Sequence, residues 1–186
     1  MAAVEGIVKI KNGNLISLSE QQLVDCDTQS HGCKDGYIET AFESIIQSNG
    51  ILSEVDYPYK TSVQTCQLNG QIAAAAQINS YEVLPANDEL LLLQAVTQQP
   101  VSVSFSVGDG FQHYKGGVYS GSCGPSLNHA VTIIGYGISE EGMKYWLVKN
   151  SYGESWGEKG YMRVLRESGD IGGQCGIAKH ALYPTI

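Results

Sequence analysis

The sequence lacks any long hydrophobic run. A helix that crosses a membrane needs roughly 18 or more consecutive apolar residues, and the leucine run Leu90–Leu93 is far shorter. Basic residues are also scarce: 11 Lys and Arg stand against 19 Asp and Glu, giving a formal net charge of -8, and they form no cluster. Nucleic acids and anionic membranes are bound by basic patches. We therefore expect neither nucleic acid nor a membrane among the partners of this chain.

Metal-binding cysteine patterns are absent as well. The five cysteines, at positions 26, 33, 66, 123 and 175, contain no CxxC pair and are spread too widely for a zinc ribbon. A site made of Cys26, His31 and Cys33 matches no common ligand spacing and has no evident fourth ligand, so we predict no metal and no cofactor. The odd number leaves one thiol without a partner in the chain.

The start of the chain lacks both a signal peptide and a helix cap. Residues 1–11 have no apolar run followed by a cleavage site, so any secretion signal is expected upstream. Apolar residues at helical spacing predict a helix that begins at Met1. It should end at Asn12–Asn14, whose residues tolerate the left-handed conformation that terminates helices. No capping residue precedes Met1, so we interpret this helix as one cut in half. Such a cut would expose apolar surface, and helix-packing residues such as Ile7 and Val8 would lose neighbours.

The remaining pattern is helical in the first half of the chain and stranded in the second. With 186 residues, 42% of them hydrophobic, the chain is large enough to bury a core. The spacing predicts an α+β protein with a helical lobe over residues 1–81, a β lobe over residues 82–186 and a site in the cleft between them. Further helices are predicted at 19–27, 36–48 and 90–98, and strands at 101–105, 131–136, 145–149 and 161–164.

Three segments resemble the plant-type papain family of cysteine proteases. They are Leu127–Ala130 (LNHA), Lys149–Gly153 (KNSYG) and Ser19–Cys26 (SEQQLVDC), and weaker matches continue in family order along essentially the whole chain. The resemblance implies a papain-like two-lobe fold, in which the second lobe is an antiparallel, β-barrel-like structure and the active-site cleft lies between the lobes.

The resemblance assigns two catalytic residues. In that family a cysteine thiolate attacks the peptide carbonyl, a histidine accepts and returns the proton, and an asparagine orients the imidazole. His129 and Asn150 match the last two roles. Taken alone, His129 could be a core histidine with its hydrogen bonds made inside the protein, and Asn150 could be a turn residue. Their sequence context favours the catalytic interpretation.

No cysteine matches the nucleophile. The family's cysteine motif lies about 130–150 residues before the histidine, and counting back from His129 passes the start of the chain. Cys26 lies closer and lacks the Gly, Ser and aromatic neighbours of the motif. We expect the nucleophile, the helix N-terminus that activates it and the oxyanion hole to lie in a missing N-terminal segment, so that the chain as given is inactive.

The resemblance also implies disulfides and substrate contacts. It pairs Cys26 with Cys66 and Cys123 with Cys175, and places the partner of Cys33 in the missing segment. It assigns Gly36 to backbone pairing with an extended peptide and Trp156 to the substrate cleft. The pocket for the second residue before the cleaved bond would be formed by Tyr37, Ser104, Leu127, Ala130 and His180. One departure is Tyr152, where most relatives have tryptophan, which gives a smaller and partly polar cover over the His129–Asn150 pair.

Two functions follow from these observations. The first is a monomeric cysteine endopeptidase, secreted, vacuolar or lysosomal, whose partners are an extended peptide or protein substrate, cystatin-like inhibitors and a propeptide. The alternative is a catalytically dead relative that acts as a peptide-binding or storage protein.

Overall fold

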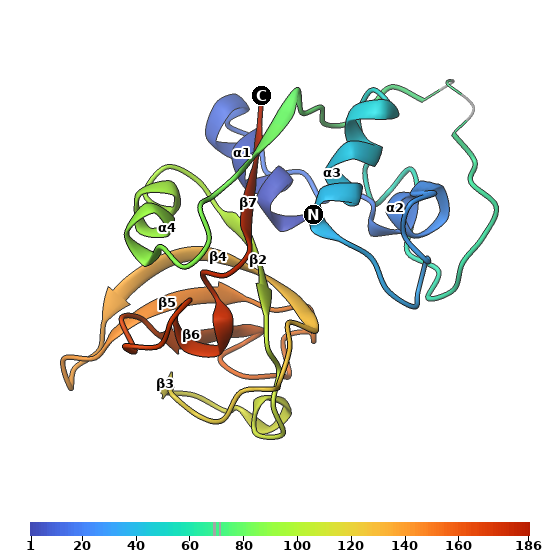
Figure 1. Ribbon diagram of the computed structural model, residues 1–186. Coiled ribbons are helices and arrows are strands. Elements are labelled where there is room, and N and C mark those ends of the chain that lie inside the picture. The colour runs from blue at the N-terminus through green and yellow to red at the C-terminus, as the bar shows by residue number, and fades with distance from the viewer. Residues whose placement is uncertain (69, 71) are drawn as a thin grey trace. The chain divides into compact units, whose positions relative to one another are not determined.

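The computed structural model of the chain describes residues 1–68, 70 and 72–186. It divides into two compact units, one formed by Met1–Glu82 with Pro184–Ile186 and the other by Val83–Tyr183. The α+β class predicted from the sequence is confirmed (Figure 1). Within the described part of the chain, none of the helices has both the length and the apolar character that crossing a bilayer requires.

In its described residues, the first unit contains three helices. They are α1 (Ala2–Asn12), α2 (Glu20–Cys26) and α3 (Ile38–Gln47). Helix α1 ends as predicted, because Gly13 takes the left-handed conformation with φ 80° and its N–H donates to Lys9 O. Ile7 and Val8, which we expected to lose packing neighbours, are nevertheless buried, at only 4% and 2% exposed.

Buried glutamines hold α2 in place. Ser19 caps the helix by accepting a hydrogen bond from Gln22 N, as the sequence predicts. The other half of a capping box is not made, because the Gln22 side chain donates to Gly50 O and accepts from Leu52 N instead. Gln22 therefore joins α2 to the segment that follows α3.

The second unit is built around a sheet. Helix α4 (Glu89–Val96) begins at Asp88, whose carboxylate accepts from the N–H groups of Leu90 and Leu91, and it ends two residues before the predicted Gln98. The long strands are β2 (Val101–Phe105), β4 (His129–Ile138), β5 (Lys144–Lys149) and β6 (Tyr161–Leu165). The elements not predicted are β1 (Ser80–Val83), β3 (Val118–Tyr119), β7 (Ala181–Thr185) and the short 3-10 helices η1 (Phe111–His113) and η2 (Gln174–Gly176).

The sheet is open rather than closed into a barrel. Its strand order is β1-β7-β2-β4-β5-β6-β3, and Figure 1 shows β4, β5 and β6 side by side. The pairs β2–β4, β2–β7, β4–β5 and β5–β6 are antiparallel, whereas β3 pairs with β6 in parallel. The resemblance implies a barrel-like second lobe, but the sheet has two open edges, formed by β1 and β3. At one of these edges, β3 runs parallel to its neighbour β6.

Alternation along these strands forms the core of the second unit. Inward-facing side chains of β2, β4, β5 and β6 pack together, and Leu92 and Val96 of α4 join them. The strand residues in this core are Val101, Val103, Phe105, Val131, Ile133, Trp146, Val148, Met162 and Val164. Because the opposite residues of β2 and β4 face away from this core, they are free to form a site.

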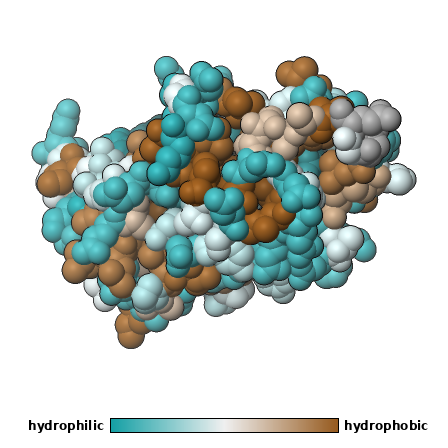
Figure 2. Space-filling view, turned by 90° about the horizontal axis from the view of Figure 1, so that it is seen from above, coloured by the Kyte–Doolittle hydropathy of each residue, from teal (hydrophilic) through white to brown (hydrophobic). Residues whose placement is uncertain are grey.

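Apolar side chains also reach the surface. On the face shown in Figure 2, brown apolar residues interrupt the teal polar surface in several places. The most exposed large apolar side chains are Val55 at 89%, Ile171 at 83% and Leu15 at 69%.

Candidate active site

The sheet brings His129 and Asn150 together although 21 residues separate them. His129 is the first residue of β4, and Asn150 directly follows β5. Because β4 and β5 are antiparallel, with Thr132 opposite Lys149, the start of one strand lies beside the end of the other. His129 Nε2 lies 2.8 Å from Asn150 Oδ1.

The contacts of Asn150 fix which way this hydrogen bond runs. Ser151 N donates to the same Oδ1 at 2.8 Å, so the atom facing the imidazole is the carbonyl oxygen and not the amide nitrogen. A carbonyl oxygen can only accept, and His129 Nε2 must therefore carry the proton. In neutral imidazole Nδ1 is then unprotonated and able to accept a proton, as a general base must.

Aromatic side chains surround this pair. The Tyr152 ring lies 5.2 Å from the His129 ring, centroid to centroid and tilted by 40°, while Phe111 meets the imidazole edge-on at 5.8 Å. Trp156 packs on Phe111 at 5.2 Å. Phe111 and Asn150 are buried, and Tyr152 is 43% exposed. Of the three rings Phe111, Trp156 and Tyr152, Tyr152 is thus the one most in contact with water.

Phe111 was missed by the sequence analysis. It lies in η1, a short helix with no periodic pattern, and an isolated aromatic residue after glycines carries no sequence signal of its own role. Its contacts with His129, Tyr152 and Trp156 arise from the tertiary fold alone.

The predicted pocket residues of the second unit lie close to His129. The register places Ser104 opposite Ala130, next to the pair of Phe105 and His129. Ser104 Oγ is 2.9 Å from His180 Nδ1, and Ser104 N donates to His180 O. These residues form a polar pair on the face of β2 that points away from the core.

The other predicted substrate residues have different surroundings. Tyr37 is 68% exposed, and it precedes α3 in the first unit. A side chain at Gly36 would have its Cβ 2.8 Å from Ser30 Oγ, so the Ser30 side chain would have to shift to make room for it. Trp156 is 8% exposed and packs on Phe111 and Tyr114, which makes it part of the aromatic cluster.

Four of the five cysteines are in disulfides. The bonds are Cys26–Cys66 in the first unit and Cys123–Cys175 in the second, the pairing that the resemblance implies. Cys33 is a free and exposed thiol. Since the Cys26 sulfur is bonded to Cys66, it cannot serve as a zinc thiolate beside His31 and Cys33. Within residues 1–68, 70 and 72–186, no three His, Cys, Asp or Glu side chains converge as metal ligands would.

Comparison with known proteins identifies the family. The family model described as "Papain family cysteine protease" matches residues 1–185. The senescence-specific cysteine protease SAG12 of Arabidopsis thaliana is 51% identical over 187 residues, a match that covers 100% of this chain and 54% of that protein. Vignain of Ricinus communis is 52% identical over 186 residues, covering 99% of this chain and 52% of that protein. The chain thus spans about half the length of these curated relatives.

Solved structures agree with this assignment. The bromelain protease of Ananas comosus in complex with the E64 inhibitor has a TM-score of 0.95 and 49% identity, covering 100% of this chain and 86% of that one. The proform of the ragweed pollen allergen Amb a 11, a cysteine protease, has a TM-score of 0.94 and 44% identity, covering 100% and 57%. With this fold and this sequence identity, the chain belongs to the papain family of cysteine proteases.

Proposed function

We propose that this chain supplies the general base and its orienting residue to a cysteine-type endopeptidase site. The supporting observation is the 2.8 Å hydrogen bond between His129 Nε2 and Asn150 Oδ1, whose direction Ser151 N fixes. The bond holds the imidazole in the tautomer that leaves Nδ1 free to accept a proton.

The reaction requires a thiol beside His129 Nδ1. The thiol proton moves to Nδ1, and the thiolate attacks the carbonyl carbon of the peptide bond. The imidazolium then returns its proton to the leaving amine as the carbon–nitrogen bond breaks, which leaves a thioester. Water, deprotonated by Nδ1, hydrolyses the thioester and restores the thiol. Asn150 Oδ1 stabilises the imidazolium throughout by accepting from Nε2–H.

We propose that none of the five cysteines in this sequence is that thiol. Four are in disulfides and have no thiolate to offer. Cys33 is a free, exposed thiol in the segment between α2 and α3, and it lacks the neighbours of the family's cysteine motif. The nucleophile would then come from polypeptide outside these 186 residues, and the chain on its own would be inactive.

Substrate, partners and compartment are proposed from the same relatives. The likeness to an E64 complex and to proform structures supports a peptide substrate, inhibitors and a propeptide as partners. By resemblance to the family, the inhibitors would be cystatin-like and the enzyme monomeric. By resemblance to the family, Gly36 would pair with the peptide backbone, and a substrate side chain would be contacted by Tyr37, Ser104, Leu127, Ala130 and His180. The two disulfides support a secreted, vacuolar or lysosomal compartment.

The test is hydrolysis of a fluorogenic peptide by two proteins: the 186-residue chain, and the same chain with a segment carrying the family's cysteine motif fused ahead of Met1. We expect no thiol-dependent activity from the first and clear activity from the second. In the fused protein His129→Ala should lower kcat/KM by roughly 100- to 10,000-fold. Activity of the unfused chain that is lost on alkylation of Cys33 would contradict the proposal, and an inactive but folded fused protein would favour a peptide-binding or storage role.

A further inference from the structure

The Cys123–Cys175 disulfide joins the two segments that hold the residues after β2. Ser106 N donates to Cys175 O at 2.9 Å, and Ser106 O accepts from Gly124 N at 3.2 Å. Val107 forms an isolated antiparallel bridge with Cys123. The sulfur–sulfur bond therefore links the backbone partners of Ser106 and Val107 to each other.

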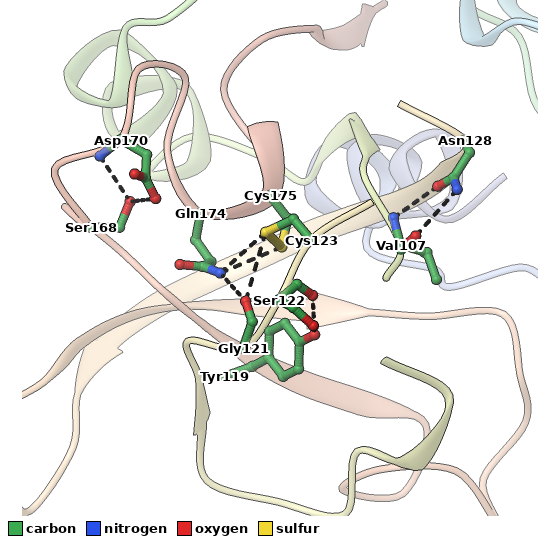
Figure 3. Close-up of a disulfide and its surroundings, with 10 residues drawn as sticks. All are labelled: Val107, Tyr119, Gly121, Ser122, Cys123, Asn128, Ser168, Asp170, Gln174 and Cys175. Atoms are coloured by element: carbon green, nitrogen blue, oxygen red, sulfur yellow. Dashed lines mark hydrogen bonds between the residues drawn. A yellow bond between two sulfur atoms is a disulfide. The ribbon is translucent and has the colours of Figure 1, made fainter. Parts of the chain in front are cut away.

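A buried amide side chain is directed at this disulfide. Gln174 is only 5% exposed, and its Nε2 lies 3.4 Å from the sulfur of Cys123 and 3.4 Å from that of Cys175 (Figure 3). The same nitrogen donates to Gly121 O at 2.8 Å. A carboxamide nitrogen carries two hydrogens, so one can stay on the carbonyl oxygen while the other faces the sulfurs. Among the described residues, no side chain donates in this way to the Cys26–Cys66 bond.

The two cysteines differ in how easily a thiol from solution can reach them. Cys123 is exposed and Cys175 is buried, so a thiolate would attack the Cys123 sulfur and the Cys175 sulfur would leave. A thiolate is stabilised by a nearby N–H donor, and a better stabilised thiolate leaves faster. Gln174 Nε2 is such a donor. Cys175 also has φ 53°, in the left-handed region that residues other than glycine rarely adopt, and breaking the bond allows it to leave that conformation.

We propose that Cys123–Cys175 is a redox-modification site for a dithiol, and that Gln174 assists its reduction. One thiol of the dithiol loses its proton to solvent and bonds to the Cys123 sulfur as the disulfide breaks. The Cys175 sulfur leaves with the electron pair and takes up a proton, next to Gln174 Nε2. The second thiol of the dithiol then displaces Cys123, so the dithiol is oxidised to a disulfide and the protein gains two thiols. The site is separate from the proposed peptidase role of the chain.

Reduction would loosen the segment that carries Phe111. Val107 lies shortly before η1, and Phe111 in η1 meets the His129 ring edge-on at 5.8 Å. Once the disulfide is broken, the bridge between Val107 and Cys123 loses its covalent anchor. We therefore expect the backbone amides of residues 106–113 to exchange faster with solvent in the reduced chain.

The test follows the reduction of each disulfide separately in the 186-residue chain. Cys33 is first blocked with one alkylating reagent. Dithiothreitol is then added, and the thiols that it frees are trapped with a second alkylating reagent and located by mass spectrometry. We expect Cys123–Cys175 to be reduced roughly three to ten times faster than Cys26–Cys66. Gln174→Met, which removes the N–H donor and keeps a long side chain, should slow the reduction of Cys123–Cys175 by a similar factor and leave that of Cys26–Cys66 unchanged. Hydrogen exchange of the selectively reduced chain measures the loosening of residues 106–113.

Tyr119→Phe is the matched control. It removes the 2.8 Å hydrogen bond from Tyr119 to Ser122 O in the same loop and keeps the amide at the sulfurs, so it should not slow the reduction (Figure 3). Should Gln174→Met fail to fold, as judged by near-UV circular dichroism, Gln174→Glu replaces it, because a carboxylate has no N–H to donate. Should neither fold, the order of reduction in the parent chain decides.

Three results would overturn the proposal. The first is a parent chain in which Cys26–Cys66 is reduced as fast as Cys123–Cys175 or faster. The second is a folded Gln174 variant that is reduced as fast as the parent, or a Tyr119→Phe chain that is slowed as much as that variant. The third, unchanged exchange of residues 106–113 after selective reduction, would refute the loosening of the Phe111 segment.

Discussion

At the scale of single residues, we expect Tyr152 to keep water from the His129–Asn150 hydrogen bond. Its ring lies 5.2 Å from the imidazole and makes an edge contact with Trp156 at 5.5 Å. Removing the ring in Tyr152→Ala admits water that competes for Asn150 Oδ1 and loosens the imidazole. We expect kcat of the fused protein to fall by roughly ten- to a hundredfold, as misplaced catalytic groups do, with KM changed little.

Tyr152→Phe is the control for this prediction, because it keeps the ring and removes only the hydroxyl. It should retain kcat within a factor of about two to three, well inside the loss expected for misplacement. If the alanine and phenylalanine variants had equal kcat, the ring would have no shielding role.

A second residue-scale prediction concerns Ser104 and His180. Their 2.9 Å contact places two hydrogen-bonding groups beside Ala130, one register pair from His129. A polar pair of this kind should favour a substrate side chain that forms hydrogen bonds over an aliphatic one. Replacing both together, as Ser104→Val with His180→Leu, avoids leaving one of them unpaired. In the fused protein we expect the kcat/KM ratio of glutamine over leucine substrates to fall by roughly 10- to 200-fold.

The matched control for this pair is Ser102→Val. Ser102 lies on the same face of β2, two residues away, where it pairs with Thr132 and Leu182. Replacing Ser102 should leave the kcat/KM ratio of glutamine over leucine substrates unchanged. A shift of similar size in Ser102→Val would mean that the whole strand, and not the Ser104–His180 pair, sets the specificity.

At the scale of elements, the sequence predicts those helices and strands whose signals are local. Gly13 ends α1 by its own conformation, and Asp88 begins α4 through its own carboxylate. Strand β2 follows Pro100, and its apolar and polar residues alternate strictly. Its buried face can therefore be predicted without knowing which strands pair with it. In each case, residues adjacent in the sequence are enough to predict where the element begins, ends or is buried.

Elements defined by distant partners could not be predicted. Strand β7 contains Pro184, which argues against a central strand, yet β7 pairs with β2 at Ala181 and Leu182. Strand β3 is only two residues long and exists through its parallel pairing with β6. The same holds in the candidate site: motif context indicated His129 and Asn150, whereas the contacts of Phe111 with His129 and Trp156 depend on segments far away in the chain.

One ion pair at the element scale makes stability depend on pH. The Arg163 side chain of β6 donates to both carboxylate oxygens of Glu158, which also accepts from Gly117 N. These hydrogen bonds, led by Arg163, outweigh partial burial and hold the pKa of Glu158 below its usual value. Glu158 therefore stabilises the fold at pH values above its unfolded pKa of about 4.3, and this contribution is lost as pH falls through its lower folded pKa.

In Glu158→Gln, the free energy of unfolding should therefore fall less steeply as pH drops from the unfolded to the folded pKa of Glu158. Above this range, the variant should be modestly less stable than the parent chain. Urea unfolding at a series of pH values measures both effects. Glu154→Gln, a neighbouring change outside the ion pair, should keep the slope of the parent chain. A slope in Glu158→Gln equal to that of the parent would show that other carboxylates govern acid unfolding.

At the scale of the whole molecule, each compact unit carries its own disulfide. Cys26–Cys66 closes a 40-residue separation in the first unit, and Cys123–Cys175 closes one of 52 residues in the second. In the chain-entropy account each bond stabilises by roughly 3 to 4 kcal/mol, which is a large share of the stability of a small unit. Reduction should therefore destabilise both units rather than one.

Thiol counting tests this arrangement directly. Since Cys33 is exposed and the other four sulfurs are bonded, the folded, unreduced chain should react with a thiol reagent once per molecule, and the reduced and denatured chain five times. Cys33→Ser should bring the first count to zero without altering the unfolding midpoint, because an exposed thiol contributes little packing. A folded parent chain that shows no reactive thiol would mean that Cys33 is bonded outside the 186 residues, and more than one would mean that a disulfide is absent in solution.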